Sequence, residues 1–456
     1  MKTYLKKLLL MLPLVVSCEQ YLEIDSPKNQ LVGTHVFEEA ATVDGAFAHI
    51  HATLRESAFT TGSASGLSYL MGHYTDELFL VSENQDSTRD FYLNSVLPTS
   101  SDVAKFWNTA YNLIYNCNRI MDGVQASGSL AKADKNRFMG EAYFIRAFIH
   151  FNMVNLFGDI PYVDTMDYKI NAEVGRMDGD AVYDKVLEDA QKAKEYLLET
   201  AGESNVFRPN YWTATAFLAR VHLYRGEWEL AKQEAERVIS DGPFVLEPEL
   251  ENVFLKQSRE TLWQLDNGTA GTNTYEGFMF IAMSAPPTNT SLTQKLVDSF
   301  EEGDARWTEW VGAISDSEQT WYYPFKYKHN GPTETTMECS ILFRLAEMYL
   351  TAAEAAAHMG QATDALYFLN AIRNRCSLNP LDGNDSAFLL ASIAQERNIE
   401  FFSEQGHRFF DLKRTGKIDE VLSLSKPYWD TTDVLLPLPE DELLSNPNLL
   451  PQNEGY

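Results

Sequence analysis

Cysteine is scarce in this chain, and the positions of its few cysteines exclude two common kinds of site. After Cys18, only Cys117, Cys339 and Cys376 remain, an odd number without C-x-x-C spacing. Zinc sites need close cysteine or histidine pairs, and a disulfide framework needs a denser set. Cys117 and Cys376 fall within helical patterns, where thiols commonly pack as small apolar groups. We therefore expect them to be buried and free.

Positive charge is also in short supply. The sequence has 37 Lys and Arg against 65 Asp and Glu, a formal charge of -28, and no Lys or Arg run after the N-terminus forms a basic patch. Such a chain repels phosphate backbones, which argues against a nucleic-acid partner. Acidity of this kind usually marks a solvated surface and leaves open a cation site, such as a calcium ion that orders a loop. No other cofactor is predicted.

Motifs for common catalytic chemistry are missing. The nine histidines form no H-E-x-x-H, and no G-x-G-x-x-G or Walker pattern provides a phosphate cradle. The segment Gly62 to Gly66 carries Ala64 where a nucleophile elbow requires serine. These absences disfavour a metalloprotease, a nucleotide enzyme and a serine hydrolase.

One charged block could suggest an acid/base site. It comprises Glu396, Arg397, Glu400, Arg408, Asp411, Lys413 and Arg414. Charged groups tolerate burial when they are paired, so we favour an ion-pair network that ties helices together.

The N-terminus indicates export. Lys2, Lys6 and Lys7 precede an apolar run from Leu8 to Val16, which is too short to span a bilayer and contains a proline. We interpret residues 1–17 as a signal peptide. Val15-Val16-Ser17-Cys18 resembles the lipobox of bacterial lipoproteins, in which the cysteine is acylated; the alternative is an ordinary cleaved signal that leaves Cys18 free. Residues 18–34 then read as a lipidated N-terminus and extended tether.

The rest of the chain, residues 35–456, is predicted to be mostly α-helical. The full length of 456 residues suits one large domain with lobes or two intimate domains, and we favour a single one. An apolar helical period runs from about Asp134 to Phe157 and stops at Gly158. Aligning Gly226 with Gly360, an offset of 134, superposes two helix–turn–helix patterns that resemble tetratricopeptide-type hairpins. Several such hairpins must stack to bury their faces, so we predict helical repeats over about 105–263 and 338–425.

Two stretches lack this period and are predicted to be loops. They are about 60–102 and 264–335, the second an insertion with short strands. From Thr320 to Lys328, Trp321, Tyr323, Phe325 and Tyr327 alternate with other residues, which indicates a strand with those aromatics on its covered face and Tyr322 facing away.

The order of several segments resembles the SusD/RagB family of outer-membrane, glycan-binding lipoproteins of Bacteroidetes-type bacteria. The matching segments are 18–23, 140–147 with 157–161, 344–350 with 353–355, 369–373, 396–402 with 406–414, and the ending Asn453-Glu454-Gly455-Tyr456. The resemblance extends over nearly the whole chain, and the order and spacing of these segments are more specific than any one motif.

The resemblance implies a lipid-anchored protein on the outer surface of the outer membrane. It would bind oligosaccharides without cleaving them and deliver them to a TonB-dependent, SusC-like transporter, with the repeats as scaffold and the loops carrying the ligand. Two alternatives stay open: a peptide-binding uptake lipoprotein of the same fold, and a glycoside hydrolase with two carboxylates about 5 to 10 Å apart.

Sugar recognition needs flat aromatic rings for the apolar face of a pyranose and polar groups for its hydroxyls. The loops supply both. The candidate ligand-binding residues are Tyr69, Asn84, Arg89 and Tyr92 in the first loop and Tyr275, Trp307, Trp310, Trp321 and Tyr322 in the second. For each of them, packing in the core is the competing interpretation.

Overall fold

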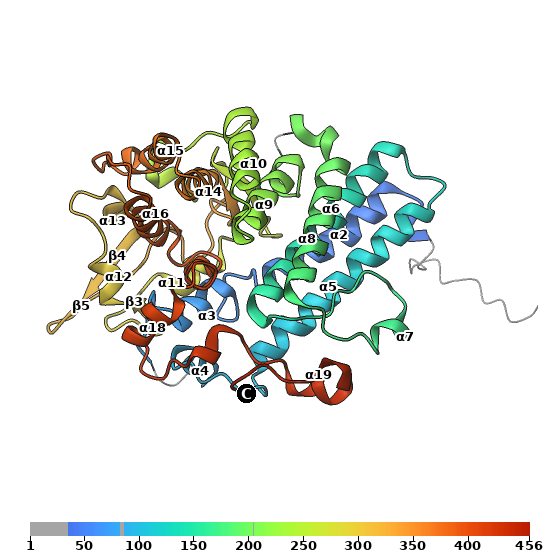
Figure 1. Cartoon of the computed structure of the whole chain (residues 1–456), viewed down its shortest axis with the longest axis horizontal. Coiled ribbons are helices and arrows are strands. Elements are labelled where there is room, and N and C mark those ends of the chain that lie inside the picture. Colours follow the sequence, from blue (N-terminus) through green and yellow to red (C-terminus); the bar gives the residue numbers. More distant parts are fainter. Residues whose placement is uncertain (1–34, 83–85, 204) are drawn as a thin grey trace, which may run out of the picture.

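The computed structural model describes residues 35–82, 86–203 and 205–456 (Figure 1). The predicted signal peptide, Cys18, the tether and Asn84 therefore lie outside the described residues. Among the described helices, none is both long enough and apolar enough to cross a membrane.

Helices dominate the structure, which confirms the predicted fold class (Figure 1). The longer helices are α2 (Ala40–Glu56), α5 (Ser101–Ala126), α6 (Lys132–Phe157), α8 (Gly179–Tyr196), α9 (Tyr211–Tyr224), α10 (Trp228–Asp241), α14 (Leu345–His358), α15 (Ala362–Arg375) and α16 (Ser386–Phe401). The shorter ones are α3 (Leu67–Tyr74), α4 (Asp86–Tyr92), α7 (Tyr168–Asn171), α11 (Tyr275–Phe280), α12 (Gln294–Val297), α13 (Ala305–Trp310), α17 (His407–Arg414), α18 (Ile418–Ser425) and α19 (Glu440–Ser445).

The strands are short and form three antiparallel pairs. They are β1 (Leu78–Leu80) with β3 (Thr290–Leu292), β2 (Thr261–Leu265) with β6 (Ser340–Arg344), and β4 (Val311–Ser315) with β5 (Thr320–Pro324).

The central helix α6 is the helix predicted from Asp134 to Phe157, and it begins two residues earlier, at Lys132. It ends where Gly158 adopts a φ of 73°, a left-handed conformation that glycine allows at little cost. From Phe144 to Phe157 all its residues are buried, because α5 and α8 pack against it on either side. Cys117 of α5 and Cys376, just after α15, are buried and free, as predicted.

The two hairpins predicted from the offset of 134 are confirmed, and their ends agree to the residue. Helix α9 (Tyr211–Tyr224) corresponds to α14 (Leu345–His358), and α10 (Trp228–Asp241) corresponds to α15 (Ala362–Arg375). The turn glycines Gly226 and Gly360 have φ angles of 71° and 72°. Helix α10 also packs on α14, so the two hairpins form one continuous stack.

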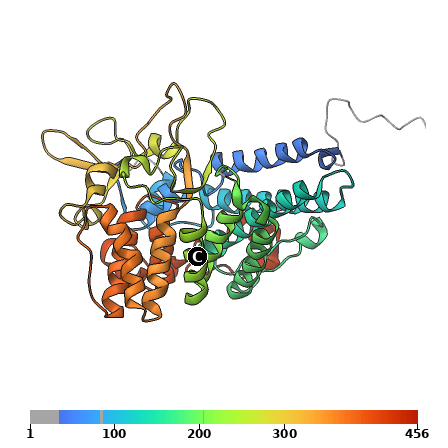
Figure 2. The ribbon, with the colours of Figure 1, turned by 90° about the horizontal axis from the view of Figure 1, so that it is seen from above.

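Figure 2 shows the repeat helices side by side on one side of the molecule and the loops of the insertion on the other. The insertion holds the predicted short strands. The first loop stretch, about 60–102, contains the helices α3 and α4, which the sequence did not predict. All eight residues of α3 are buried, so its sequence shows no contrast between an apolar and a polar face.

The observed strand is shorter than the predicted Thr320–Lys328, and the prediction of which of its faces is covered was wrong. Strand β5 ends at Pro324, and Tyr322 packs against the core and against Trp307, with ring centroids 5.0 Å apart. Tyr323 instead lies over Gly312 of the paired strand. Alternation fixes which residues share a face, but it does not decide which of the two faces is covered.

The charged block at 396–414 forms the predicted network of buried ion pairs and joins the insertion to the helices. Arg306 of α13 contacts Asp304 at 2.8 Å, Glu396 at 2.7 Å and Glu400 at 2.9 Å. Glu400 also pairs with Arg344 and Arg375. The remaining pairs of the block are Arg397–Asp411, Arg408–Asp76, Arg414–Glu354 and Arg414–Asp411.

Lys413 stands apart from this network. Its ammonium donates to the carbonyl oxygen of Asn155 at 2.5 Å, and it has no carboxylate partner among the described residues. Burial lowers the pKa of Lys413 to about 7.

Candidate ligand-binding cavity

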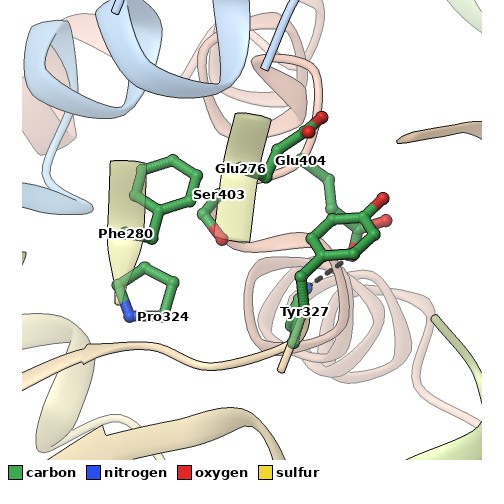
Figure 3. A pocket seen from close by; sticks show the side chains of 7 residues that line it. Glu276, Phe280, Pro324, Tyr327, Ser403 and Glu404 are labelled. Atoms are coloured by element: carbon green, nitrogen blue, oxygen red, sulfur yellow. Dashed lines mark hydrogen bonds and ion pairs between the residues drawn. The ribbon is translucent and has the colours of Figure 1, made fainter. Parts of the chain in front are cut away.

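Two hollows can be set aside before the main one is described. Figure 3 shows a small void with Phe280 and Pro324 on one side and Tyr327 and Glu404 on the other. Its volume is about 10 Å³, room for one water molecule at most. A second hollow is larger, about 860 Å³, and lies between Phe37, one face of α5 and the segment 127–129; none of its lining residues comes from the predicted loop stretches.

The hollow that the loops form, here called the loop cavity, has a volume of about 670 Å³. That volume suits a short oligosaccharide. Its walls come from the end of α2, the segment 63–65, the start of α5, and the insertion. The lining residues from the first half of the chain are Arg55, Glu56, Ser63, Ala64, Ser65, Ser87 and Asp102. Those from the insertion and β6 are Asn267, Thr269, Thr272, Asn273, Thr274, Tyr275, Phe278, Met279, Asn330, Gly331, Pro332 and Ser340.

Two exposed aromatic rings line this cavity from the short helix α11. Tyr275 is 45% exposed and Phe278 is 68% exposed, and they are three positions apart, so they lie on one helix face. Thr274 caps the helix by accepting a hydrogen bond from the Gly277 amide at 3.1 Å. Gly277 lets α11 approach the backbone at His329, where a Cβ atom would come within 2.2 Å of the carbonyl oxygen.

Beneath these rings, the side chain of Glu276 points into the protein. Its carboxylate accepts a hydrogen bond from the Ser340 hydroxyl at 2.7 Å. A Cβ atom on Gly62 would lie 2.0 Å from this carboxylate, which explains a glycine at that position. Burial raises the pKa of Glu276 to about 7. Glu276 thus faces the small void of Figure 3 and touches the loop cavity only through its hydrogen bond with the lining residue Ser340.

The amides in the wall hold the loops in place. Asn267 donates to the carbonyl oxygens of Thr272 and Glu338, at 2.8 and 2.7 Å. Asn273 donates to Gly331 and accepts from the amides of Met337 and Glu338. The hydroxyls of the wall, including those of Ser63 and Ser65, add groups that can both donate and accept.

Of the predicted ligand residues, the structure places Tyr275 in the loop cavity. Tyr69 and Trp310 are 0% exposed: Tyr69 packs on His73 and Phe280, and the Trp310 indole donates to the Leu250 carbonyl at 3.1 Å. Neither ring reaches the surface, so both residues pack in the core and are not available to a ligand.

The other predicted residues lie outside the lining of this cavity. Trp307 and Tyr322 pack on each other and are half-buried, as is Trp321 on β5. On α4, Arg89 is exposed, and Tyr92 is half-buried against Phe79 and His73.

Sequence reasoning missed Phe278 and Asp102 as lining residues. For Phe278 a signal existed, because Thr274 and Gly277 mark a helix start and place Phe278 one turn from Tyr275. For Asp102 none existed, because an acidic residue in a first helical turn is ordinary.

One group of possible metal ligands occurs among the described residues, namely Cys376, Glu396 and Glu400. Arg306 pairs with both glutamates, and Arg375 pairs with Glu400. Burial raises the pKa of the Cys376 thiol to about 12. A neutral thiol beside guanidinium groups suits a structural network and does not suit a cation.

Two family models match the chain. One, described as "SusD family", matches residues 308–456, and the other, described as "Starch-binding associating with outer membrane", matches residues 20–223. Among curated proteins, SusD-like protein P2 of Formosa agariphila is 27% identical, with all of both chains covered. SusD-like protein P25 of the same organism is 25% identical over 96% of this chain and 97% of its own.

Solved structures share the fold. A SusD superfamily protein from Bacteroides vulgatus superposes with a TM-score of 0.81 at 20% identity, covering 92% of this chain and all of its own. A structure described as a laminarin-binding SusD-like protein gives a TM-score of 0.76 at 21% identity, covering 91% and 99%.

Proposed function

We propose that this member of the SusD/RagB family captures an oligosaccharide in the loop cavity without cleaving it. The observation that carries this proposal is the pair of exposed rings, Tyr275 and Phe278, beside a cavity of about 670 Å³. Exposed aromatic rings on one face cover the apolar face of a pyranose, and the surrounding hydroxyls and amides bond its rim.

The test is isothermal titration calorimetry of the full-length protein in a detergent without sugar groups. Laminarin oligosaccharides come first, because a structural neighbour is described as binding laminarin. Other plant, host and microbial oligosaccharides and a set of peptides follow. Saturable heat with one glycan class supports the proposal, whereas heat with peptides alone favours the peptide-binding alternative.

Each glycan that binds is then incubated with the protein and assayed for new reducing ends. We expect none. Release of reducing ends would replace the binding role with glycoside hydrolysis.

Delivery to a SusC-like, TonB-dependent transporter is the second part of the proposal. The repeat helices lie on the side away from the loops of the insertion (Figure 2). They offer a scaffold surface on which a transporter can dock while the loop cavity stays accessible. Affinity purification from native outer membranes, followed by mass spectrometry, tests this part. Recovery of a TonB-dependent transporter supports delivery, and its absence from repeated purifications contradicts it.

Anchoring through acylated Cys18 on the outer surface is the third part. Cys18→Ser is expected to move the protein from the membrane fraction to the soluble fraction, because the acyl chains supply the membrane affinity. Protease accessibility on intact cells reports on which side of the membrane the protein lies.

A further inference from the structure

The hairpin formed by β4 and β5 carries aromatic side chains on its outer face. Val311 and Tyr322 lie on the opposite face and pack against the buried core. Side chains alternate between the two faces of a strand, so Ile314, Trp321 and Tyr323 lie on the face away from the core. None of these three packs against the core cluster of the described residues.

The rings on this outer face form one surface. Tyr323 lies over Gly312, where a Cβ atom would come within 2.3 Å of the ring, so the glycine leaves room for it. The rings of Tyr323 and Phe325 meet edge to face, with centroids 6.0 Å apart. The Lys328 ammonium lies 4.2 Å from the centroid of the Phe325 ring. The set Ile314, Trp321, Tyr323 and Phe325 is here called the β-hairpin face.

Trp321 has an unused polar group on this face. It is half-buried, and in the part of the chain that the structure describes its indole N–H donates to no acceptor and its ring has no aromatic partner. A sugar can cover the flat ring with its apolar face and accept from the N–H with a hydroxyl. The exposed acids of the hairpin turn, Asp316 and Glu318, would repel a nucleic acid or an anionic membrane.

The chain runs directly from the β-hairpin face into the wall of the loop cavity. Phe325 comes five positions before Asn330, which lines the cavity, so the two backbones lie at most roughly 18 Å apart. The end of β5 also lies beside α11, because Phe280 and Pro324 together line the small void of Figure 3. The two sets of aromatic rings in the insertion thus lie on neighbouring elements.

We propose that the β-hairpin face is a second carbohydrate-binding surface, where Trp321 stacks on sugar units of a glycan chain that extends out of the loop cavity. This inference rests on the proposed function and deepens it, because it makes the ligand a chain longer than the cavity holds. Once one part of the chain is bound in the cavity, contact with the second surface is intramolecular, so even one ring raises the affinity measurably.

The first measurement uses the unaltered full-length protein. Calorimetry compares oligosaccharides of laminarin, cellulose and starch, each from the disaccharide to the octasaccharide. In the series that binds, the octasaccharide is expected to bind roughly tenfold more tightly than the trisaccharide. Equal affinity for the two lengths overturns the inference and leaves the proposed function standing. Binding of no glycan in the wider panel overturns the proposed function itself.

The second measurement uses Trp321→Leu, which keeps an apolar side chain and removes the flat ring and the N–H. Affinity for the octasaccharide is expected to fall roughly tenfold, and affinity for the trisaccharide is expected to stay unchanged. Tyr367→Leu, on α15 and 67% exposed, is the matched control and should bind both lengths normally. The trisaccharide reports on the loop cavity of the same protein, so a loss confined to the octasaccharide does not come from misfolding.

Two results would overturn the role of Trp321. One is an affinity for the octasaccharide that Trp321→Leu leaves unchanged or lowers no more than the affinity for the trisaccharide. The other is self-association, measured by sedimentation velocity, that the parent shows and Trp321→Leu loses. That result would make the β-hairpin face a contact between two copies of this chain.

Discussion

The repeat half and the loop half of the molecule use their side chains differently. In the repeats, α9 and α14 bury nearly all of their residues, and two hairpins 134 residues apart keep the same helix ends. In the loops, Phe278 and Met283 are 68% and 76% exposed, and hydrogen bonds from Asn267 and Asn273 take the place of regular secondary structure. A rigid stack can thus carry a binding surface whose residues are not needed for its own stability.

The buried ion pairs around Arg306, here called the ion-pair seam, join the insertion to helix α16. Removing them is expected to have the largest effect on stability. Arg306→Met leaves Asp304, Glu396 and Glu400 as buried carboxylates with less compensation. Breaking a buried pair in this way costs about 3–5 kcal/mol of unfolding free energy. Urea unfolding followed by tryptophan fluorescence measures the loss.

Lys417→Met is the matched control for the seam. Its partner Glu420 is 67% exposed, and a pair of this kind contributes about 0–1 kcal/mol. Equal losses in the two variants would show that the seam does not join the halves energetically.

The aromatic rings of α11 should affect binding and leave stability unchanged. In the double variant Tyr275→Ala and Phe278→Ala, we expect the Kd for the bound glycan to rise roughly a hundredfold, since covering each ring contributes about 1.5 kcal/mol or more. The melting temperature should stay within a few degrees, because both rings are exposed in the free protein.

Tyr168→Ala, on α7 and 74% exposed, is the control for removal of a surface ring. It should bind the glycan with the parent affinity. A large drop in melting temperature for the double variant would mean that α11 is part of the structural core.

Glu276 is a buried acid in helix α11, directly between the two exposed rings in sequence. It therefore tests how a residue of the loop half contributes to stability. Its pKa is raised to about 7 from an ordinary value near 4.5, so the folded state holds its proton more tightly than the unfolded chain. The contribution of Glu276 to stability is therefore full below pH 4.5 and is lost as the pH rises to 7. Glu276→Gln should abolish this loss and be more stable than the parent at pH 8, by roughly 3 kcal/mol.

Melting temperatures of parent and variant from pH 4.5 to 8 test this expectation. The two curves should meet near pH 4.5 and diverge as the pH rises. A constant difference across the range would show that Glu276 does not titrate there.

The repeats could be predicted because helix period, turn glycines and internal repetition are local signals that tertiary packing reinforces. Gly226 and Gly360 marked both turns correctly. The loop cavity could not be predicted in the same way, because long-range contacts decide which aromatic ring stays exposed. Tyr69 and Tyr275 both lie in stretches that were predicted to be loops. Phe280 and His73 pack on Tyr69, whereas Tyr275 is 45% exposed.

The turn glycines provide the smallest test and act only on the repeat half. In Gly360→Ala the new Cβ atom meets nothing within 4 Å, so its cost is that of a left-handed φ of 72°, about 1 kcal/mol. Gly226→Ala should cost slightly more, since its Cβ atom would lie 3.3 Å from the Trp228 ring. Gly45→Ala, at an exposed site inside α2, should instead stabilise the protein by about 0.5–1 kcal/mol. Glycan affinity should be unchanged in all three variants; a change in affinity at either turn would mean that the scaffold positions the loops more tightly than the separation of the two halves implies.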